Sequence, residues 1–411
     1  MADVTASETV EITGHLMDSG ILSRVLDDIR EYEGDYVIDR FDVGHDAMDT
    51  SHATITVSAD DDEALQRLLM RLQTRGVNMV DPGEASISVA DMDGVFPDGF
   101  YSTTNLATKV RLGGKWFDVE NPEMDCGLVV EGERVYTLPM SDVRIGMNVV
   151  CGASGIRVIV PLPDKSSESF GFMESDVSSE KPQAVLVRQV ADGMREAKAS
   201  GKKVLWVGGP GVVHTGAAPA MVALVNAGFV DVLFAGNALA THDIESSLYG
   251  TSLGVDLAQG RGVEHGHEHH IRAINTIRKE GSIQAAVENG VLTGGIMHAL
   301  VTRGGEFVLV GSVRDDGPLP DVYTDVIEGQ RAMRAKLTDV GFCLMVATML
   351  HSVATGNILP ASIPLVCVDI NPATVTKLAD RGSSQARGIV TDVGLFLEQL
   401  AVELVPGYRR R

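Results

Sequence analysis

The chain has 411 residues, 44% of them hydrophobic, which is enough to bury two or three separate cores. Its 34 Lys and Arg residues are outnumbered by 56 Asp and Glu residues, and the formal net charge of -22 argues against nucleic acid or an anionic membrane surface as a partner. The four cysteines form no CxxC pair, and neither a signal sequence nor an apolar run of about 18 residues is present, so we expect a cytoplasmic protein without a membrane span.

The N-terminal segment mixes helical and strand periodicities. Residues 21–34 and 61–76 place apolar side chains at helical spacing on one face. Residues 35–43 and 51–59 instead alternate apolar and polar side chains, as half-buried strands do. The order βαββαβ is that of a ferredoxin-like unit, and we expect a small α+β domain over residues 1–93. Such units bind amino acids in some regulatory proteins and more often only pack or dimerise, so both interpretations stay open.

The middle of the chain loses the helical period. Short β-rich runs follow one another there, separated by glycine-containing turns, and residues 165–182 have the Ser-rich, charged composition of a linker. We expect a β-rich segment and linker over residues 94–180. Within it, Asp125 and Cys126 are candidates for an acid and thiol pair, although a buried structural cysteine is the commoner case.

From Pro182 onward, helical segments alternate with short strands that are apolar on both faces. These strands are residues 202–209, 229–236, 305–312 and 363–370. Strands of this kind belong in a parallel sheet that helices cover on both sides. We therefore expect residues 181–411 to form a Rossmann-like, doubly wound domain of the α/β class.

The first of these strands ends in Gly208-Gly209-Pro210-Gly211 and runs into an apolar helix. Glycines at the end of a parallel strand let the backbone approach a pyrophosphate, and the following helix N-terminus favours negative charge. Gly209 and Gly211 are therefore candidates for cofactor binding. The loop is not a full GxGxxG motif because His214 stands at the third glycine position, so a tight turn without a ligand stays an alternative.

Another strand ends at Asp369. An acidic residue in this place can accept hydrogen bonds from the adenosine ribose hydroxyls and favours NAD over NADP. Asp369 could instead cap the next helix, but Asn371 and Pro372 already supply a cap and a first helical residue. We therefore predict that Asp369 binds the ribose.

Polar residues directly follow two further strands. Asn237, Asp315 and Asp316 would lie at the carboxyl edge of the sheet, where open α/β sheets bind ligands. Because Gly317 and Pro318 follow the two aspartates, these can equally be a cap and a turn residue. If one of them is catalytic, burial beside the other would raise the pKa of its carboxyl and make it a proton-transfer group.

The His-rich run HGHEHH, residues 265–270, contains metal-ligand side chains. Its spacing is not HExxH, and it leads into an amphipathic helix. We favour a solvent-edge or substrate-contacting loop over a zinc site, and we expect no metal site in the chain.

Six longer strings resemble the archaeal-type ornithine cyclodeaminase family: TGHLMDSGIL, EMDCGLVV, GGPGVVHTGA, FAGNALATHD, GSVRDDGPLPDV and NPATVTKLADRGSSQARGIVTDVG. The resemblance covers essentially the whole chain. This family also forms the C-terminal part of cyanobacterial arginine dihydrolase/ornithine cyclodeaminase enzymes, and its N-terminal region is named for lysine-ketoglutarate reductase/saccharopine dehydrogenase proteins. The resemblance implies conversion of ornithine to proline with release of ammonia, using bound NAD.

The resemblance also implies a nucleotide pocket. Matched position by position, this pocket falls on Asn237, Ala238, Asp315, Met349, Leu350, His351, Ser352, Asp369, Asp392 and Val393. Asn237, Asp315 and Asp369 also follow from the strand ends, whereas the other positions rest on the resemblance alone.

The implied chemistry returns the cofactor unchanged. A hydride leaves the ornithine α-carbon for NAD, the δ-amine attacks the resulting imine, ammonia leaves, and the cyclic imine is reduced to proline. Such a reaction needs a general acid or base near the amines, and Asp316 is our candidate. The family suggests a homo-oligomer, and without the dihydrolase domain of the fused enzymes we expect no arginine hydrolysis. The alternatives are a saccharopine or lysine-branch NAD-dependent dehydrogenase and a non-catalytic sensor of NAD and an amino acid.

Overall fold

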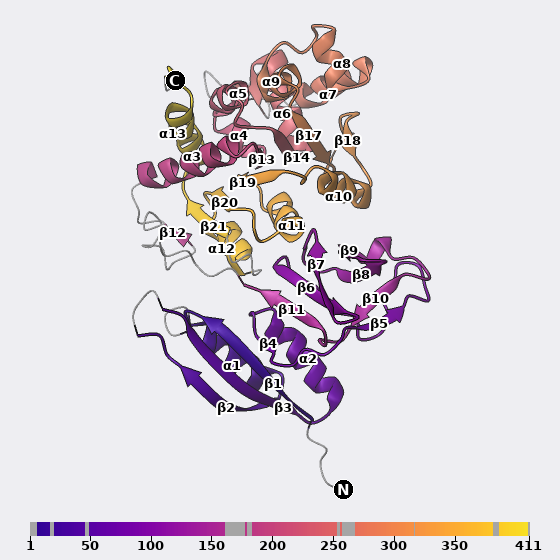
Figure 1. Ribbon diagram of the computed structural model, residues 1–411. Coiled ribbons are helices and arrows are strands. Elements are labelled where there is room, and N and C mark those ends of the chain that lie inside the picture. Colours follow the sequence, from indigo (N-terminus) through magenta and orange to yellow (C-terminus); the bar gives the residue numbers. More distant parts are fainter. Residues whose placement is uncertain are drawn as a thin grey trace. The chain divides into compact units, whose positions relative to one another are not determined.

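The computed structural model describes residues 6–16, 20–45, 49–160, 177–178, 183–252, 255–256, 268–315, 317–380 and 386–409. The chain forms two compact units (Figure 1). The first comprises Met1–Phe172 with Asn357–Ser362, and the second comprises Met173–Gly356 with Ile363–Arg411. Each unit encloses its own hydrophobic core.

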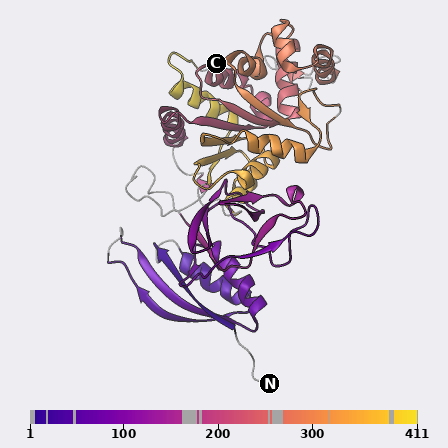
Figure 2. The ribbon, with the colours of Figure 1, turned by 45° about the vertical axis from the view of Figure 1, so that its right-hand side comes forward.

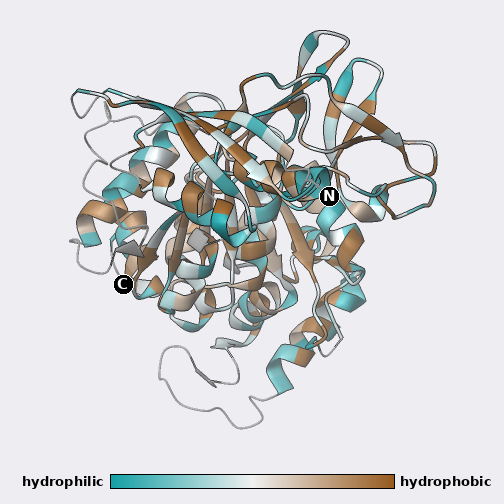
Figure 3. Ribbon diagram, turned by 90° about the horizontal axis from the view of Figure 1, so that it is seen from below, coloured by the Kyte–Doolittle hydropathy of each residue, from teal (hydrophilic) through white to brown (hydrophobic). Residues whose placement is uncertain are grey.

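The first part of the N-terminal unit is an antiparallel four-stranded sheet with two helices. Its elements are β1 (Ala6–Gly14), α1 (Ile21–Glu31), β2 (Asp35–Asp42), β3 (Ser51–Ala59), α2 (Asp62–Gln73) and β4 (Asn78–Met79). The strand order β2-β3-β1-β4 confirms the predicted ferredoxin-like unit. Hydrophobic and hydrophilic residues alternate along these strands (Figure 3), and every second side chain of β3 is buried. Asp61 caps the N-terminus of α2, and its carboxylate accepts a hydrogen bond from the Ala64 N–H at 2.7 Å.

The predicted last strand of this unit is shorter in the structure than in the sequence pattern. Only Asn78–Met79 pairs with β1, whereas β5 (Ser86–Val89) pairs with a different sheet. Pro82 lacks a backbone N–H and Gly83 adopts a left-handed φ of 63°, so the chain turns between the two strands.

The predicted β-rich middle segment forms a mixed seven-stranded sheet. Besides β5, its elements are β6 (Ala107–Leu112), β7 (Lys115–Glu120), β8 (Gly127–Glu131), β9 (Arg134–Leu138), the 3-10 helix Met140–Asp142, β10 (Asn148–Cys151) and β11 (Ile156–Ile159). The strand order is β11-β6-β7-β9-β8-β10-β5, and β7 and β9 are the parallel pair. Gly113 and Gly114, both with positive φ, form the tight turn of the β6–β7 hairpin. Val110, Leu128 and Val150 of this sheet are fully buried and belong to one hydrophobic core.

The second unit is built on a parallel sheet of eight described strands. They are β12 (Val177–Ser178), β13 (Lys203–Gly208), β14 (Val232–Gly236), β17 (Glu306–Val310), β18 (Val322–Tyr323), β19 (Val340–Val346), β20 (Leu365–Asp369) and β21 (Ala386–Val390). A short antiparallel pair, β15 (Thr251–Ser252) and β16 (Val255–Asp256), lies outside it. The central strands β13, β14, β19 and β20 are buried almost throughout, as their apolar sequences predict. This confirms the doubly wound α/β domain.

The strand order shows how this sheet relates to a Rossmann fold. The order is β12-β21-β20-β19-β13-β14-β17-β18. Numbered in chain order and read from the β17 side, the strands β17, β14, β13, β19, β20 and β21 follow the Rossmann order 3-2-1-4-5-6. The strands β18 and β12 are added at the two edges, and β13 is the first strand of the fold. The sequence pattern predicted four of these strands and missed β19, which is central.

Helices cover both faces of the sheet (Figures 1 and 2). They are α3 (Gln183–Ala199), α4 (Gly211–His214), α5 (Ala218–Asn226), α6 (Asn237–Tyr249), α7 (His269–Glu280), α8 (Ile283–Glu288), α9 (Gly295–Arg303), α10 (Val326–Ala335), α11 (Leu350–Ile358), α12 (Pro372–Asp380) and α13 (Val393–Leu404). The helices α3, α5, α6, α9 and α13 share one core with the sheet, in which Trp206, Met221 and Phe396 are wholly buried. None of the helices in the described ranges is long and apolar enough to cross a membrane.

Candidate functional site

The strands β13 and β19 are neighbours at the centre of the second unit, although about 130 residues separate them in the chain. After β13 the chain enters α4, and after β19 it enters α11; Figure 1 draws these helices on opposite faces of the sheet. The order of the sheet reverses direction at this pair. Open α/β sheets bind their ligands in the crevice at the carboxyl ends of such a pair.

The two loops that leave β13 and β19 touch at Gly209. A Cβ atom on Gly209 would lie 1.9 Å from the carbonyl oxygen of Ala347, and one on Gly211 would lie 2.9 Å from the Ala347 Cβ. Ala347 itself has a φ of 54°, in the left-handed region. Both glycines therefore allow a close approach of two backbones. Gly209 also lines the pocket described next, so its packing role is compatible with the predicted contact to a phosphate. Gly211 does not line this pocket.

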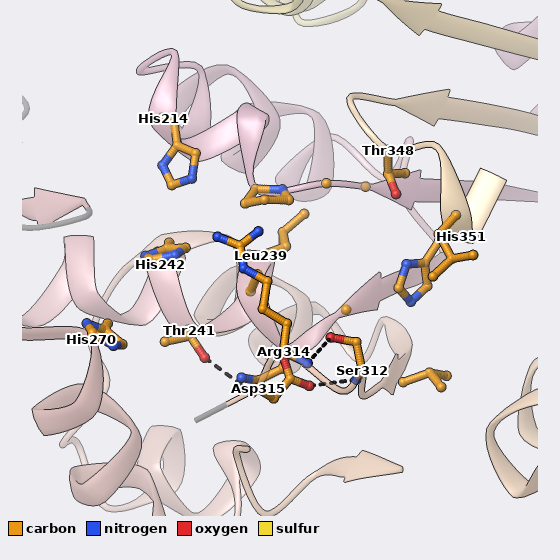
Figure 4. A pocket seen from close by; sticks show the side chains of 18 of the residues that line it. His214, Leu239, Thr241, His242, His270, Ser312, Arg314, Asp315, Thr348 and His351 are labelled. Atoms are coloured by element: carbon orange, nitrogen blue, oxygen red, sulfur yellow. Dashed lines mark hydrogen bonds between the residues drawn. The ribbon is translucent and has the colours of Figure 1, made fainter. Parts of the chain in front are cut away.

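A pocket of about 410 Å³ lies at these strand ends, within the range of known small-molecule sites. Its walls are the glycine loop after β13, the first two turns of α6, the loop after β17 and the first turn of α11. Figure 4 shows Thr348 and His351 at one end, His214, His242 and His270 at the other, and Arg314 between them. The pocket thus joins the two halves of the sheet.

The end of the pocket near β19 is formed by the start of α11. Thr348, Leu350 and His351 line it, and the first backbone N–H groups of a helix carry partial positive charge. Burial lowers the pKa of His351, while a hydrogen bond with the backbone of Val310 and the charge of Asp315 act in the opposite direction. A neutral imidazole is therefore favoured here.

Two hydroxyl groups of α11 lie behind this end of the pocket. Ser352 and Thr355 are fully buried, and their side-chain oxygens have no hydrogen-bond partner among the described residues. Buried hydroxyls nearly always have a partner. A bound group with hydrogen-bonding atoms would supply what is missing.

Asn237 and Asp315, both predicted from strand ends, line the pocket together with Ala238. The carboxamide oxygen of Asn237 accepts hydrogen bonds from the Leu319 N–H at 3.0 Å and the Thr241 hydroxyl at 3.2 Å. One carboxylate oxygen of Asp315 accepts the Ser312 N–H at 2.8 Å. Both side chains therefore also shape the loop after β17.

The other predicted nucleotide contacts lie beyond the pocket walls. Asp369 ends β20 and is nine-tenths buried, and one of its carboxylate oxygens accepts the Asn371 N–H at 2.8 Å. Asn371 in turn accepts the Ala373 N–H, as expected for a helix cap. Asp392 caps α13 by accepting the Leu395 N–H at 2.7 Å.

Met349, Ser352 and Val393 complete the predicted set, and none of them lines the pocket. Val393 belongs to the hydrophobic core. The binding role of these residues, and of Asp369 and Asp392, stays a prediction.

Sequence reasoning missed a cluster of imidazoles at the other end of the pocket. His214 from α4 and His242 from α6 lie with their ring centroids 4.8 Å apart, and His270 from α7 lies 6.4 Å from His242. Burial, the first cause, and the neighbouring His242 lower the pKa of His214, while Glu245 raises it. FAGNALATHD contains His242, but only the fold brings it close to the other two histidines.

Three family models match successive parts of the chain. Residues 7–106 match the LOR/SDH bifunctional enzyme conserved region, residues 107–187 match the first region of the arginine dihydrolase ArgZ-like C-terminal part, and residues 188–400 match its Rossmann fold. Ornithine cyclodeaminase of Methanothermobacter thermautotrophicus is 51% identical over 96% of this chain and 97% of its own. Ornithine cyclodeaminase of Methanopyrus kandleri is 50% identical over 97% of each chain.

The chain belongs to the ornithine cyclodeaminase family. The family models and these relatives confirm the resemblance that the six sequence strings indicated.

Solved structures of fused cyanobacterial members show the same fold. The apo structure of ArgZ matches with a TM-score of 0.86 and 35% identity over 97% of this chain. The ternary complex of AgrE with ornithine and NAD+ matches with a TM-score of 0.53 and 40% identity over 97% of this chain. This chain spans 58% and 57% of those two chains.

The remaining candidates from the sequence are Asp316, the histidine-rich run 265–270 and Cys126. Asp316 and His265 to His267 lie outside the described residues. In the rest of the run, Glu268 pairs with Arg272 and His269 contacts the Thr251 hydroxyl at 2.8 Å. No group of three metal-ligand side chains is found in the part of the chain that the structure describes. Cys126 is buried.

Proposed function

We propose that this enzyme converts L-ornithine to L-proline with release of ammonia and uses bound NAD as a recycled redox cofactor. The observation that carries the proposal is the near full-length identity of about half of the residues with proteins named ornithine cyclodeaminase. The relative AgrE has been solved with ornithine and NAD+. A pocket at the switch point of the sheet supports the same reading.

The residues of this chain fit a dinucleotide. Asp369 at the end of β20 would hold the adenosine ribose, and the N-terminus of α11 would face the pyrophosphate. When bound, NAD supplies a hydride acceptor and donor, so that the α-carbon can be oxidised, attacked by the δ-amine with loss of ammonia, and reduced again.

The protein must position the amino acid, exclude water and move protons between nitrogen atoms. Asp316 remains our candidate for one proton transfer, since its neighbour Asp315 lines the pocket. Asp316→Asn should leave NAD binding unchanged and slow turnover by about 100-fold or more. Full activity of this variant would remove Asp316 from the mechanism.

The decisive experiment uses ornithine that carries deuterium on the α-carbon. Purified protein with NAD should release ammonia and proline in equal amounts, without net NADH, and the proline should keep the deuterium at the same carbon. Net NADH with saccharopine would support the dehydrogenase alternative. Binding of NAD and ornithine without any product would support the sensor.

A further inference from the structure

The inference concerns the imidazole end of the pocket and rests on the proposed function. His242 is 8% exposed, and its ring lines the pocket. The Nδ1 atom of this ring lies 2.8 Å from Oε2 of Glu245, one turn further along α6. A carboxylate at this distance accepts the Nδ1 proton and fixes the ring orientation, so that Nε2 is left as the basic nitrogen.

Glu245 is itself held in place. Its side chain is completely buried, and its second carboxylate oxygen accepts the Thr251 hydroxyl at 2.9 Å. The Thr251 oxygen also lies 2.8 Å from Nδ1 of His269. The pair therefore combines a base with a buried carboxylate that fixes the orientation of its ring.

Other titratable groups surround His242 and would share its response to pH. They are Glu245 on α6, His214 on α4, His269 and His270 on α7, and Arg314 and Asp315 in the loop after β17. The Nδ1 atom of His214 is already 2.7 Å from the Ser252 hydroxyl. Of the four imidazoles that line the pocket, His242 is the one paired with a buried carboxylate in the described part of the chain.

The location favours the substrate over the nucleotide. His242 lies on α6, which follows β14, whereas Asp369 and α11 belong to the β19–β20 half of the sheet. With the adenosine ribose on Asp369, as proposed above, a dinucleotide that crosses the switch point would place its nicotinamide toward β13 and β14. The imidazole end is therefore the end where an amino acid would meet the reactive ring.

We propose that His242, oriented by Glu245, moves the proton that allows ammonia to leave. After the δ-nitrogen bonds to the α-carbon, the new ring nitrogen carries one proton too many. Nε2 of His242 takes this proton and gives it to the exocyclic nitrogen. The bond from the α-carbon to that nitrogen then breaks, its electron pair leaves on ammonia, and the ring nitrogen forms the double bond. The step consumes no proton and no electron overall. His242 is the catalytic residue and Glu245 a positioning residue.

The test compares His242→Gln and Glu245→Gln with His52→Gln, a histidine of the first unit that contacts Thr13. His242→Gln should lower turnover by about 100-fold or more while the dissociation constant of NAD changes less than twofold. In a single turnover, reduced nicotinamide should build up on this variant, because oxidation proceeds and ammonia release does not. His52→Gln should behave like the unmodified protein.

Two further measurements separate proton transfer from a structural role. Glu245→Gln should lower kcat with little change in the KM for ornithine, because the imidazole loses the carboxylate that orients it. Added imidazole should restore part of the turnover of His242→Ala. Turnover of His242→Gln within threefold of normal would overturn the inference. A loss of turnover in His242→Gln without build-up of reduced nicotinamide would also overturn it.

The same data distinguish this inference from the proposed function. If the unmodified protein makes no proline from ornithine, the proposed function fails. If it makes proline and the His242 variants do so equally well, only the role of His242 fails.

Discussion

The half of the sheet formed by β19, β20 and β21 offers a ligand backbone N–H groups, hydroxyls and a carboxylate, whereas the half formed by β13, β14 and β17 offers three imidazoles. The first set suits an anion and a sugar, which need fixed hydrogen bonds. The second set consists of side chains that can accept and donate protons. The comparison suggests that binding and proton transfer are divided between the halves. Substitutions in one half should then change NAD affinity, and substitutions in the other should change pH dependence.

The largest expected effect concerns Asp243, in the half of the sheet that contains β14. It tests whether a change of turnover with pH in this half reflects catalysis or the stability of the fold. Asp243, next to His242, is fully buried, and its carboxylate accepts the Ile296 and Met297 N–H groups at the start of α9, both at 2.8 Å. Burial raises its pKa from 3.8 to about 6, against the effect of these hydrogen bonds. Because the folded protein then holds this proton more tightly than the unfolded chain, the contribution of Asp243 to stability is greatest below pH 3.8 and is lost as the pH rises through about 6.

The difference in unfolding free energy between the unmodified protein and Asp243→Asn should therefore grow by about 2–3 kcal/mol from pH 7 to pH 4. Chemical denaturation at several pH values measures it. A difference that stays constant would show that Asp243 does not titrate in this range. A change in turnover that followed this stability curve would break the division between the halves.

The second effect concerns the contact that joins the halves. In Gly209→Ala, the new Cβ would lie 1.9 Å from the Ala347 carbonyl oxygen, so one loop must move. We expect the unfolding free energy to fall by about 2–3 kcal/mol and NAD binding to weaken. The control is Gly356→Ala, whose Cβ would lie 3.3 Å from a methyl group of the buried Leu378 and which should therefore lower stability less than Gly209→Ala does. Equal stability of both variants would contradict the close approach at Gly209.

A third substitution tests whether the β19–β20 half of the sheet binds NAD. Asp369→Ala should weaken NAD binding by about 1–3 kcal/mol, measured by calorimetry, because hydrogen bonds to a charged group are lost. The shape of the pH profile should not change. Unchanged affinity would remove Asp369 from the nucleotide site.

The smallest effect separates the two roles of Asp392. Asp392→Ala should lower the unfolding free energy by about 1 kcal/mol, because α13 loses its cap. Asp392→Ser keeps a capping oxygen and should restore most of this stability. If the carboxylate also contacts the nucleotide, both variants should show the same loss of NAD affinity. Normal affinity of the serine variant would leave capping as the role of its carboxylate.

The sequence allowed the fold class to be predicted because its strands are apolar on both faces and its N-terminal strands alternate. β19 was missed although Val340–Val346 is nearly all apolar, and without it the switch point could not be placed. The residues 349–352 therefore came from the family resemblance alone. The histidine cluster could not be predicted from spacing, because His214, His242 and His270 come from three helices that only tertiary packing brings together. Asp369 was accessible to sequence reasoning because the end of a strand is a local feature.

The long separation in the chain between β13 and β19 has a consequence for biosynthesis. Residues 203–208 leave the ribosome long before residues 340–346, with which they must pair at the middle of the sheet. Until then, β13 and the glycine loop have an open edge, and no complete crevice exists. Asp369, the proposed ribose-binding residue, is translated later still, so we expect the protein to capture its nucleotide only when synthesis is nearly finished.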